Sequence, residues 1–287
     1  MGAEKMRKRR MEEAVAKSLM LGSLGLVLGS LLAIVGVVAW KGVSALSLSM
    51  LIETPSGGYY LGKGGGVANA IVGSLYLSLG ASLLSILLSL PVAFALQREY
   101  ASPRLANFTR LMLDVLWGIP SVVYGAVGFI IMAYLGITAS LLGGIIALTL
   151  LMLPIMSRSM EEVIRIVPLE LKETSYALGA TRIETALRVV FRQALPGIVT
   201  AILLAFGRGI GDAASILFTA GYTDRIPRSL LDPVASLPLA VFFQMGTPIP
   251  EVQRRAYASA LILLLMVLAV ILVSRLLGSR FSRNLVR

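Results

Sequence analysis

The sequence predicts an all-α integral membrane protein with six transmembrane helices. Hydrophobic residues make up 57% of the 287 residues and charged residues only 14%, and the mean hydropathy is +0.85. Uncharged apolar stretches longer than about 18 residues are typical of membrane spans. Inside a bilayer the backbone must satisfy its own hydrogen bonds, so we expect these stretches to be helices.

The six predicted spans follow from these stretches, taken in chain order. The first span follows a polar, basic tail, and it is longer than the core of a cleaved signal peptide, which is the alternative. Residues 115–157 lack charge but are too long for one helix, so we expect a tight turn at 134–138 to divide them. The predicted spans are 19–40, a helix within 64–97, 111–133, 139–157, 195–220 and 256–274.

The distribution of basic residues predicts the orientation of the chain. Nineteen of the 26 Lys and Arg residues lie in segments on the side of the N-terminus, six lie on the opposite side, and Arg208 lies within a span. Because cytoplasmic segments are enriched in Lys and Arg, both termini are predicted to face the cytoplasm of a cell-membrane protein. We divide the chain into a cytoplasmic tail, 1–17, and a single transmembrane domain, 18–287.

The composition excludes several kinds of chemistry. The chain contains neither cysteine nor histidine, which excludes disulfides, thiolate or histidine metal sites and histidine-based catalysis. The net charge of +11 would also suit nucleic-acid binding, but the basic residues lie beside apolar spans, so we expect no nucleic-acid partner. Residues 57–63 resemble a nucleotide-binding loop, but Gly64 stands where Ser or Thr would bind magnesium. We therefore expect no ATP site, metal or cofactor on this chain.

The longest predicted cytoplasmic loop, between the fourth and fifth spans, is expected to form two short helices. Pro168 suits the first turn of a helix over 169–178, and Gly179 is placed to end that helix in a left-handed turn. Thr181 and Glu184 form a capping-box pattern that starts a second helix. One apolar face of the second helix is predicted to contain Ile183, Ala186, Leu187, Val190 and Ala194.

Two charged residues fall inside the fifth predicted span. Arg208 lies about 20 Å along the helix from Leu195, well inside a hydrocarbon core of about 30 Å. A charge at this depth is costly, so it should face a polar path and have a partner. Asp212 follows four residues later and would share the face of a continuous helix. The sequence therefore predicts an Arg208–Asp212 pair that lines a pathway or, alternatively, only holds two helices together.

Two further charges lie at predicted helix ends. Arg158, at the cytoplasmic end of the fourth span, either lines the inner exit of the pathway or reaches toward the lipid headgroups, which is the default for such an arginine. Asp114 is expected in the first turn of the third span, where a carboxylate favours the helix dipole.

The cytoplasmic loop resembles the signature loop of ABC importer permeases, whose pattern is Glu-Ala-Ala, three residues and Gly. Residues 173–179 match this pattern, with Thr174 and Ser175 in place of the two alanines. The family's later Leu-Pro is missing, because residues 189–192 read Val-Val-Phe-Arg. This departure affects the docking contacts and not the two-helix arrangement.

Residues 65–277 are similar to the permease subunits of phosphate-specific ABC importers, and more to the PstA type than to its partner type. Three segments carry the resemblance: 65–73, 118–125 and 207–220. The last is the most specific, since the family usually reads Gly-Arg-Ala-Ile-Gly-Glu-Thr-Ala-Pro there. In this chain Asp212, Ala213 and Ser215 replace the Glu, Thr and Pro.

This resemblance implies a type I, MetI-like importer permease fold with a cytoplasmic coupling helix, and the import of inorganic phosphate by alternating access. The implied substrate-pathway residues are Arg208, Asp212 and Arg158. The implied ATPase-coupling residues are Glu173, Thr174, Ser175 and Gly179. The implied partners are a second homologous permease, an ATP-binding cassette ATPase dimer that holds ATP and Mg, an extracytoplasmic phosphate-binding protein and the lipid bilayer.

Other functions remain open at this stage. A permease of the same fold for another oxyanion or solute would also use an arginine, which favours an anion without naming it. An intramembrane enzyme would be limited to Ser-Lys or aspartate-dyad chemistry, and the aspartates form no obvious dyad on facing spans. A stand-alone ion channel would not need a structured docking loop.

Overall fold

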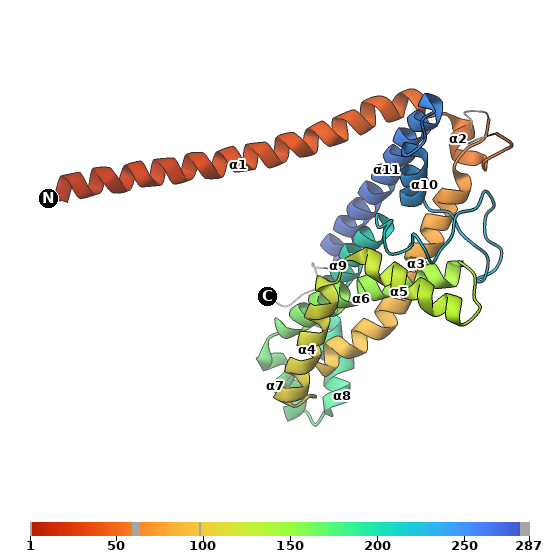
Figure 1. Cartoon of the computed structure of the whole chain (residues 1–287). Coiled ribbons are helices and arrows are strands. Elements are labelled where there is room, and N and C mark those ends of the chain that lie inside the picture. Colours follow the sequence, from red (N-terminus) through yellow and green to blue (C-terminus); the bar gives the residue numbers. More distant parts are fainter. Residues whose placement is uncertain (1, 59–63, 98, 282–287) are drawn as a thin grey trace.

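A computed structural model describes residues 2–58, 64–97 and 99–281. The described chain is helical, with one isolated β-bridge between Pro55 and Gly65. Residues 59–63, which belong to the segment that resembles a nucleotide-binding loop, lie outside the described residues. The same is true of Arg98 and of residues 282–287. The helices (Figure 1) are α1 Gly2–Ala45, α2 Leu48–Ile52, α3 Ala68–Ala95, α4 Pro103–Gly118, α5 Ser121–Tyr134, α6 Leu141–Arg165, α7 Leu169–Ala177, α8 Arg182–Glu184, the π-helix η2 Thr185–Val190, α9 Phe191–Ile210, α10 Leu237–Met245 and α11 Pro250–Phe281.

Five helical segments are long and apolar enough to cross a membrane, and a bent pair of helices makes a sixth candidate if the pair is one span. Each of the six predicted spans overlaps one of these candidates. The single segments are Met6–Ala45, Ala68–Ala95, Leu141–Arg165, Arg182–Ile210 and Pro250–Val273, and the bent pair is Pro103–Gly118 with Ser121–Tyr134.

The third span is not the continuous helix predicted over 111–133, because α4 and α5 meet at an angle of 96°. Pro120 lacks an N–H and disfavours helical geometry in the residue before it. Ile119 accordingly adopts an extended conformation, with φ −71° and ψ 129°. The predicted turn at 134–138 is confirmed, since α5 ends at Tyr134 and Gly136 has a φ of +70°.

The fifth span was predicted as a helix over 195–220, and this prediction is wrong at its end. The helix α9 stops at Ile210, and the chain then runs without regular helix to α10. Three glycines, at positions 207, 209 and 211, surround the stop. Each glycine costs a helix about 1 kcal/mol relative to alanine, so the local sequence favours the end of the helix there.

The core of the molecule lies between α3, α6 and α9, which run side by side (Figure 1). Its largest buried side chains include Leu77, Leu148, Met152 and Met156. The long helix α1 contacts α11 near Gly42, where an added Cβ would lie 2.8 Å from the Tyr257 carbonyl oxygen. The rest of α1 extends away from the bundle, and its apolar stretch buries nothing within this chain. The helix α1 continues without a break across residue 17, where the cytoplasmic tail was predicted to end.

Candidate functional site

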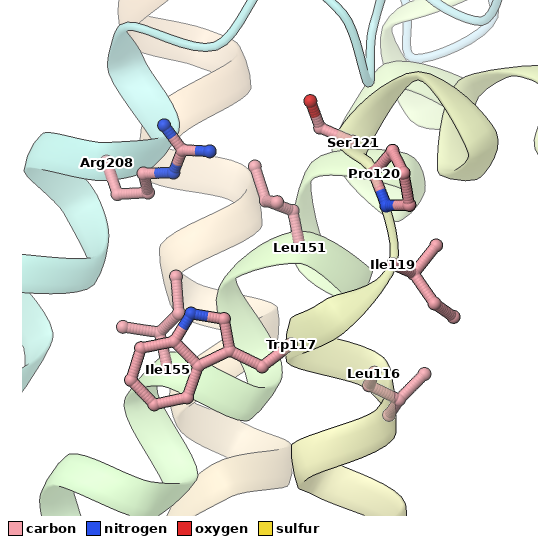
Figure 2. Close-up of a pocket in the computed structure, with 8 residues that line it drawn as sticks. All are labelled: Leu116, Trp117, Ile119, Pro120, Ser121, Leu151, Ile155 and Arg208. Carbon is pink, nitrogen blue, oxygen red and sulfur yellow. The ribbon is translucent and has the colours of Figure 1, made fainter.

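A cavity of about 170 Å³ opens where α4 and α5 meet, and it is bordered by α6 and α9. Six of its eight lining residues have apolar side chains, and Ser121 and Arg208 are the polar ones. Figure 2 shows Arg208 approaching it from α9, while Pro120 and Ser121 approach from the α4–α5 break. The lining residues are Leu116, Trp117, Ile119, Pro120, Ser121, Leu151, Ile155 and Arg208.

Arg208 is the charged residue of this cavity, and its side chain is exposed in the single chain. Among the described residues, no carboxylate forms an ion pair with its guanidinium. The first turn of α5, which begins at Ser121, has no side-chain cap in the described chain. A helix N-terminus carries a partial positive charge, so the cavity combines a guanidinium with a second electropositive feature.

Asp212 does not pair with Arg208, so the predicted couple is wrong. Because α9 ends at Ile210, the four-residue spacing no longer places the two side chains on one helix face. The Asp212 carboxylate is 7% exposed and accepts a hydrogen bond of 2.8 Å from the Ser215 N–H. Asp212 thus stabilises the turn that follows α9.

Arg158 lies in a cluster of four alternating charges between α4 and α6. Its Nε is 3.1 Å from Asp114 Oδ1, and its Nη1 donates to Glu161 Oε2 at 2.9 Å. The other Glu161 oxygen accepts from Arg110 Nε at 2.6 Å. Arg158 thus has two carboxylate partners in the described chain, and both of its expected roles, at the inner exit or at the headgroups, stay predictions. Asp114 lies in the last turns of α4 and not in a first turn, because α4 begins at Pro103.

The segment α7–α8 forms one end of the molecule (Figure 1), which we call the α7 end. Gly179 adopts the predicted left-handed conformation, with a φ of +83°, and its N–H donates to the Tyr176 carbonyl at 2.9 Å. The predicted capping box is confirmed: Glu184 Oε2 accepts from the Thr181 N–H at 2.9 Å, and the Thr181 hydroxyl accepts from the Glu184 N–H at 3.3 Å. The Thr181 N–H and the Thr181 hydroxyl each donate to Glu184 Oε2 at 2.9 Å, and these two hydrogen bonds lower the pKa of the exposed Glu184 carboxyl.

The remaining predicted coupling residues divide into exposed and buried ones. Glu173 and Thr174 are exposed on α7. Ser175 is buried and its hydroxyl lies 2.9 Å from the hydroxyl of Thr185, which joins α7 to the π-helix η2. The α7 segment therefore presents Glu173 and Thr174 outward while Ser175 fixes it to the next helix.

The predicted apolar face of the second helix is only partly correct. Ala186, Val190 and Ala194 are buried, but Ile183 and Leu187 are 68% and 60% exposed. The π-helical winding of η2 spaces residues differently from the α-helix that the prediction assumed. The exposed apolar side chains of the α7 end and of the residues that flank it, which we call the tip patch, are Ile166, Leu169, Leu178, Ile183 and Leu187.

Sequence reasoning missed a connection between the α3–α4 loop and the α7 end. Glu99 accepts from Lys172 Nζ at 2.9 Å and from the Tyr176 hydroxyl at 3.1 Å. Its backbone carbonyl accepts from Arg182 Nη1 at 3.0 Å. Burial and the bond to Glu99 raise the pKa of Tyr176. These partners lie more than seventy residues from Glu99, and no local pattern in the sequence indicates the contact.

Comparison with known proteins identifies the class of membrane protein to which this chain belongs. A family model described as binding-protein-dependent transport system inner membrane component matches residues 85–287, and the chain belongs to this family. Among solved structures, a chain of the inward-facing MetNI methionine ABC transporter matches with a TM-score of 0.58 and 19% identity, covering 77% of this chain and 96% of that one. The architecture is that of MetI-like ABC importer permeases.

Individual relatives come from bacteria and archaea. The phosphate transport system permease protein PstA of Mycobacterium leprae is 38% identical over 71% of this chain and 67% of its own length. The probable ABC transporter permease protein YqgI of Bacillus subtilis is 31% identical over 96% of this chain and 99% of its own. The probable phosphate transport system permease protein PstA of Methanocaldococcus jannaschii is 33% identical over 72% and 73%.

Proposed function

We propose that this chain is a transmembrane permease subunit of an ATP-driven importer of inorganic phosphate. The names of its relatives support the substrate. The observation that carries the proposal is Arg208, a guanidinium that lines a cavity and has no carboxylate partner among the described residues. A permanently charged arginine on a membrane span needs a compensating anion, and here a transported anion supplies it.

Phosphate suits this cavity for chemical reasons. A guanidinium matches two phosphate oxygens in a bidentate arrangement. The Ser121 hydroxyl and the uncapped start of α5 border the same space as Arg208 and favour an anion. Asp212 acts on this site indirectly. Its carboxylate accepts a hydrogen bond from the Ser215 N–H, which stabilises the turn after α9 and so fixes the position of Arg208.

The proposal includes the orientation of the chain in the membrane and the partners on each side. We place the α7 end in the cytoplasm, in agreement with the distribution of Lys and Arg. The tip patch, together with the exposed Glu173 and Thr174, would dock on an ABC ATPase dimer that binds ATP and Mg. Gly179 shapes this docking segment by reversing the chain after α7. A second, homologous permease completes the pathway, and an extracytoplasmic phosphate-binding protein delivers the ligand.

Mechanical coupling has a continuous structural route. From Arg182 to Ile210 the chain is helical without interruption, through α8, η2 and α9. A displacement of the tip by ATPase closure is therefore transmitted along one rod to Arg208. The Glu99 contacts attach the α3–α4 loop to the same tip, so α3 and α4 move with it.

The test is phosphate uptake by the assembled transporter in proteoliposomes. Arg208→Ala removes at least two charge-assisted hydrogen bonds and should lower uptake of labelled phosphate by about a hundredfold or more. Arg165→Ala is the matched control, because the Arg165 side chain is 63% exposed and its ion pair in the described chain is with the exposed Glu162. Unlabelled sulfate should compete less well than unlabelled phosphate. Normal uptake by Arg208→Ala in a fully assembled transporter would contradict the proposal.

A further inference from the structure

The four-charge cluster, formed by Arg110, Asp114, Arg158 and Glu161, lies next to the Arg208 cavity. The helices α4 and α6 contribute residues to both. On α6, Leu151 and Ile155 line the cavity and Arg158 follows three residues later. On α4, Trp117 lines the cavity and Asp114 precedes it by three residues. Residues three or four apart lie on one face of a helix, about one turn from each other. The Asp114–Arg158 ion pair therefore spans α4 and α6 directly beside the cavity, on the side of the α7 end.

The cluster has a fixed part and a free part. Glu161 has a side chain only 4% exposed and is held by both Arg110 and Arg158. Arg110 also donates to the Leu96 carbonyl at 2.9 Å and to Asn107 Oδ1 at 3.1 Å. Asp114, in contrast, has a side chain that is 52% exposed, and in the described chain it forms an ion pair with Arg158. Arg158 is thus oriented from α6, while Asp114 is the member that can leave.

We infer that the Asp114–Arg158 ion pair is the gate on the cytoplasmic side of the Arg208 cavity. This inference rests on the proposed function for its direction and its substrate. Half-exposed ion pairs contribute little stability, so this contact can open and close during each transport cycle. Opening requires only that the Asp114 end of α4 moves away from α6.

The charge balance explains how opening would favour the leaving anion. With the gate closed, the two arginines and two carboxylates of the cluster neutralise one another. When Asp114 moves away, Arg110, Arg158 and Glu161 remain in contact and carry one net positive charge. A phosphate that leaves Arg208 then passes a cationic surface, whereas the closed gate presents a carboxylate that repels it.

The experiment measures access to the cavity directly. The chain has no native cysteine, so Ser121→Cys places a unique thiol in the cavity wall with little change in size. The assembled, ATP-free transporter in inside-out vesicles is treated with membrane-impermeant methanethiosulfonate reagents, one anionic and one cationic. Asp114→Asn should speed labelling by both reagents about fivefold, the effect on an opening equilibrium of losing one half-exposed ion pair.

Three further results decide the inference. Asp114→Glu should restore slow labelling, because it keeps the carboxylate. Glu162→Gln should leave the rate unchanged, because it removes an exposed ion pair on α6 that does not bridge to α4. An unchanged rate in Asp114→Asn, or an increase with the anionic reagent alone, would overturn the gate. Labelling does not require phosphate, so this result stands independently of the uptake of Arg208→Ala.

Discussion

Arg208 and Arg158 lie near the same cavity but in opposite surroundings. Arg208 borders the cavity and has no carboxylate partner in the part of the chain that the structure describes. Arg158 contacts two carboxylates, and one of them, Glu161, is almost fully buried and shared with Arg110. The two arginines were predicted to act on one pathway, and of the two only Arg208 has no carboxylate partner in the described chain.

The difference separates the binding role that we propose for Arg208 from the gating role that we propose for Arg158. A paired guanidinium has its charge compensated within the protein, and its removal leaves buried carboxylates without partners. An unpaired guanidinium contributes little to stability and much to the attraction of an anion. The two sites should therefore respond in opposite ways to mutation.

The largest expected effect on stability is that of Glu161→Ala. Loss of this carboxylate leaves Arg110 and Arg158 without a shared partner, at a cost near the lower end of about 3–5 kcal/mol, since both side chains are partly hydrated. Arg208→Ala should change stability by less than about 0.5 kcal/mol. Thermal unfolding of the purified transporter in detergent measures both, and an equal loss for the two variants would remove the distinction.

A smaller effect is expected when the charge of Arg208 is kept and its shape is changed. Arg208→Lys retains a cation but loses the planar, two-pronged donor, so phosphate uptake should fall about tenfold, less than for alanine. The measurement is the initial rate of uptake at several phosphate concentrations. If Arg208→Lys supports the same rate of uptake as the wild type, phosphate binding needs only a positive charge and not the bidentate geometry of a guanidinium.

The smallest effect is expected for Glu184, an exposed carboxylate that serves as a counterpart to the buried Glu161. Its folded pKa is lowered from an ordinary value of 4.5 by hydrogen bonds from Thr181. Its contribution to stability is therefore present above pH 4.5 and is lost as the pH falls through the lower, folded value. Unfolding compared between the wild type and Glu184→Gln across this range should converge at acidic pH. A difference that instead grows on acidification would show that the sign is wrong.

Local features of the fold were predictable because their causes are local. The left-handed Gly179 and the capping box of Thr181 and Glu184 depend on neighbours within five residues. The spans depend on runs of apolar residues, which the chain displays clearly. Pro120 indicates the break in the third span, whereas the uncharged stretch around it favours one continuous helix.

The candidate site was harder to predict because it depends on where a helix stops and on distant contacts. The Arg208–Asp212 pair was derived from helical spacing, although the three glycines around it already argued for a helix end. Arg158 and Asp114 belong to helices that are far apart in sequence, so their ion pair becomes visible only when α4 packs on α6. The cavity arises from that same packing.

The π-helix η2 has a consequence for the geometry of transport. It lies between the α7 end and α9. Its backbone hydrogen bonds join residues five apart, whereas those of an α-helix join residues four apart. Rewinding of this segment into α-helical register would rotate everything beyond it by about 100° and shift it by about 1.5 Å. A small change in winding near the tip would thereby turn the Arg208 guanidinium toward or away from the space it borders, without any bend in the rod.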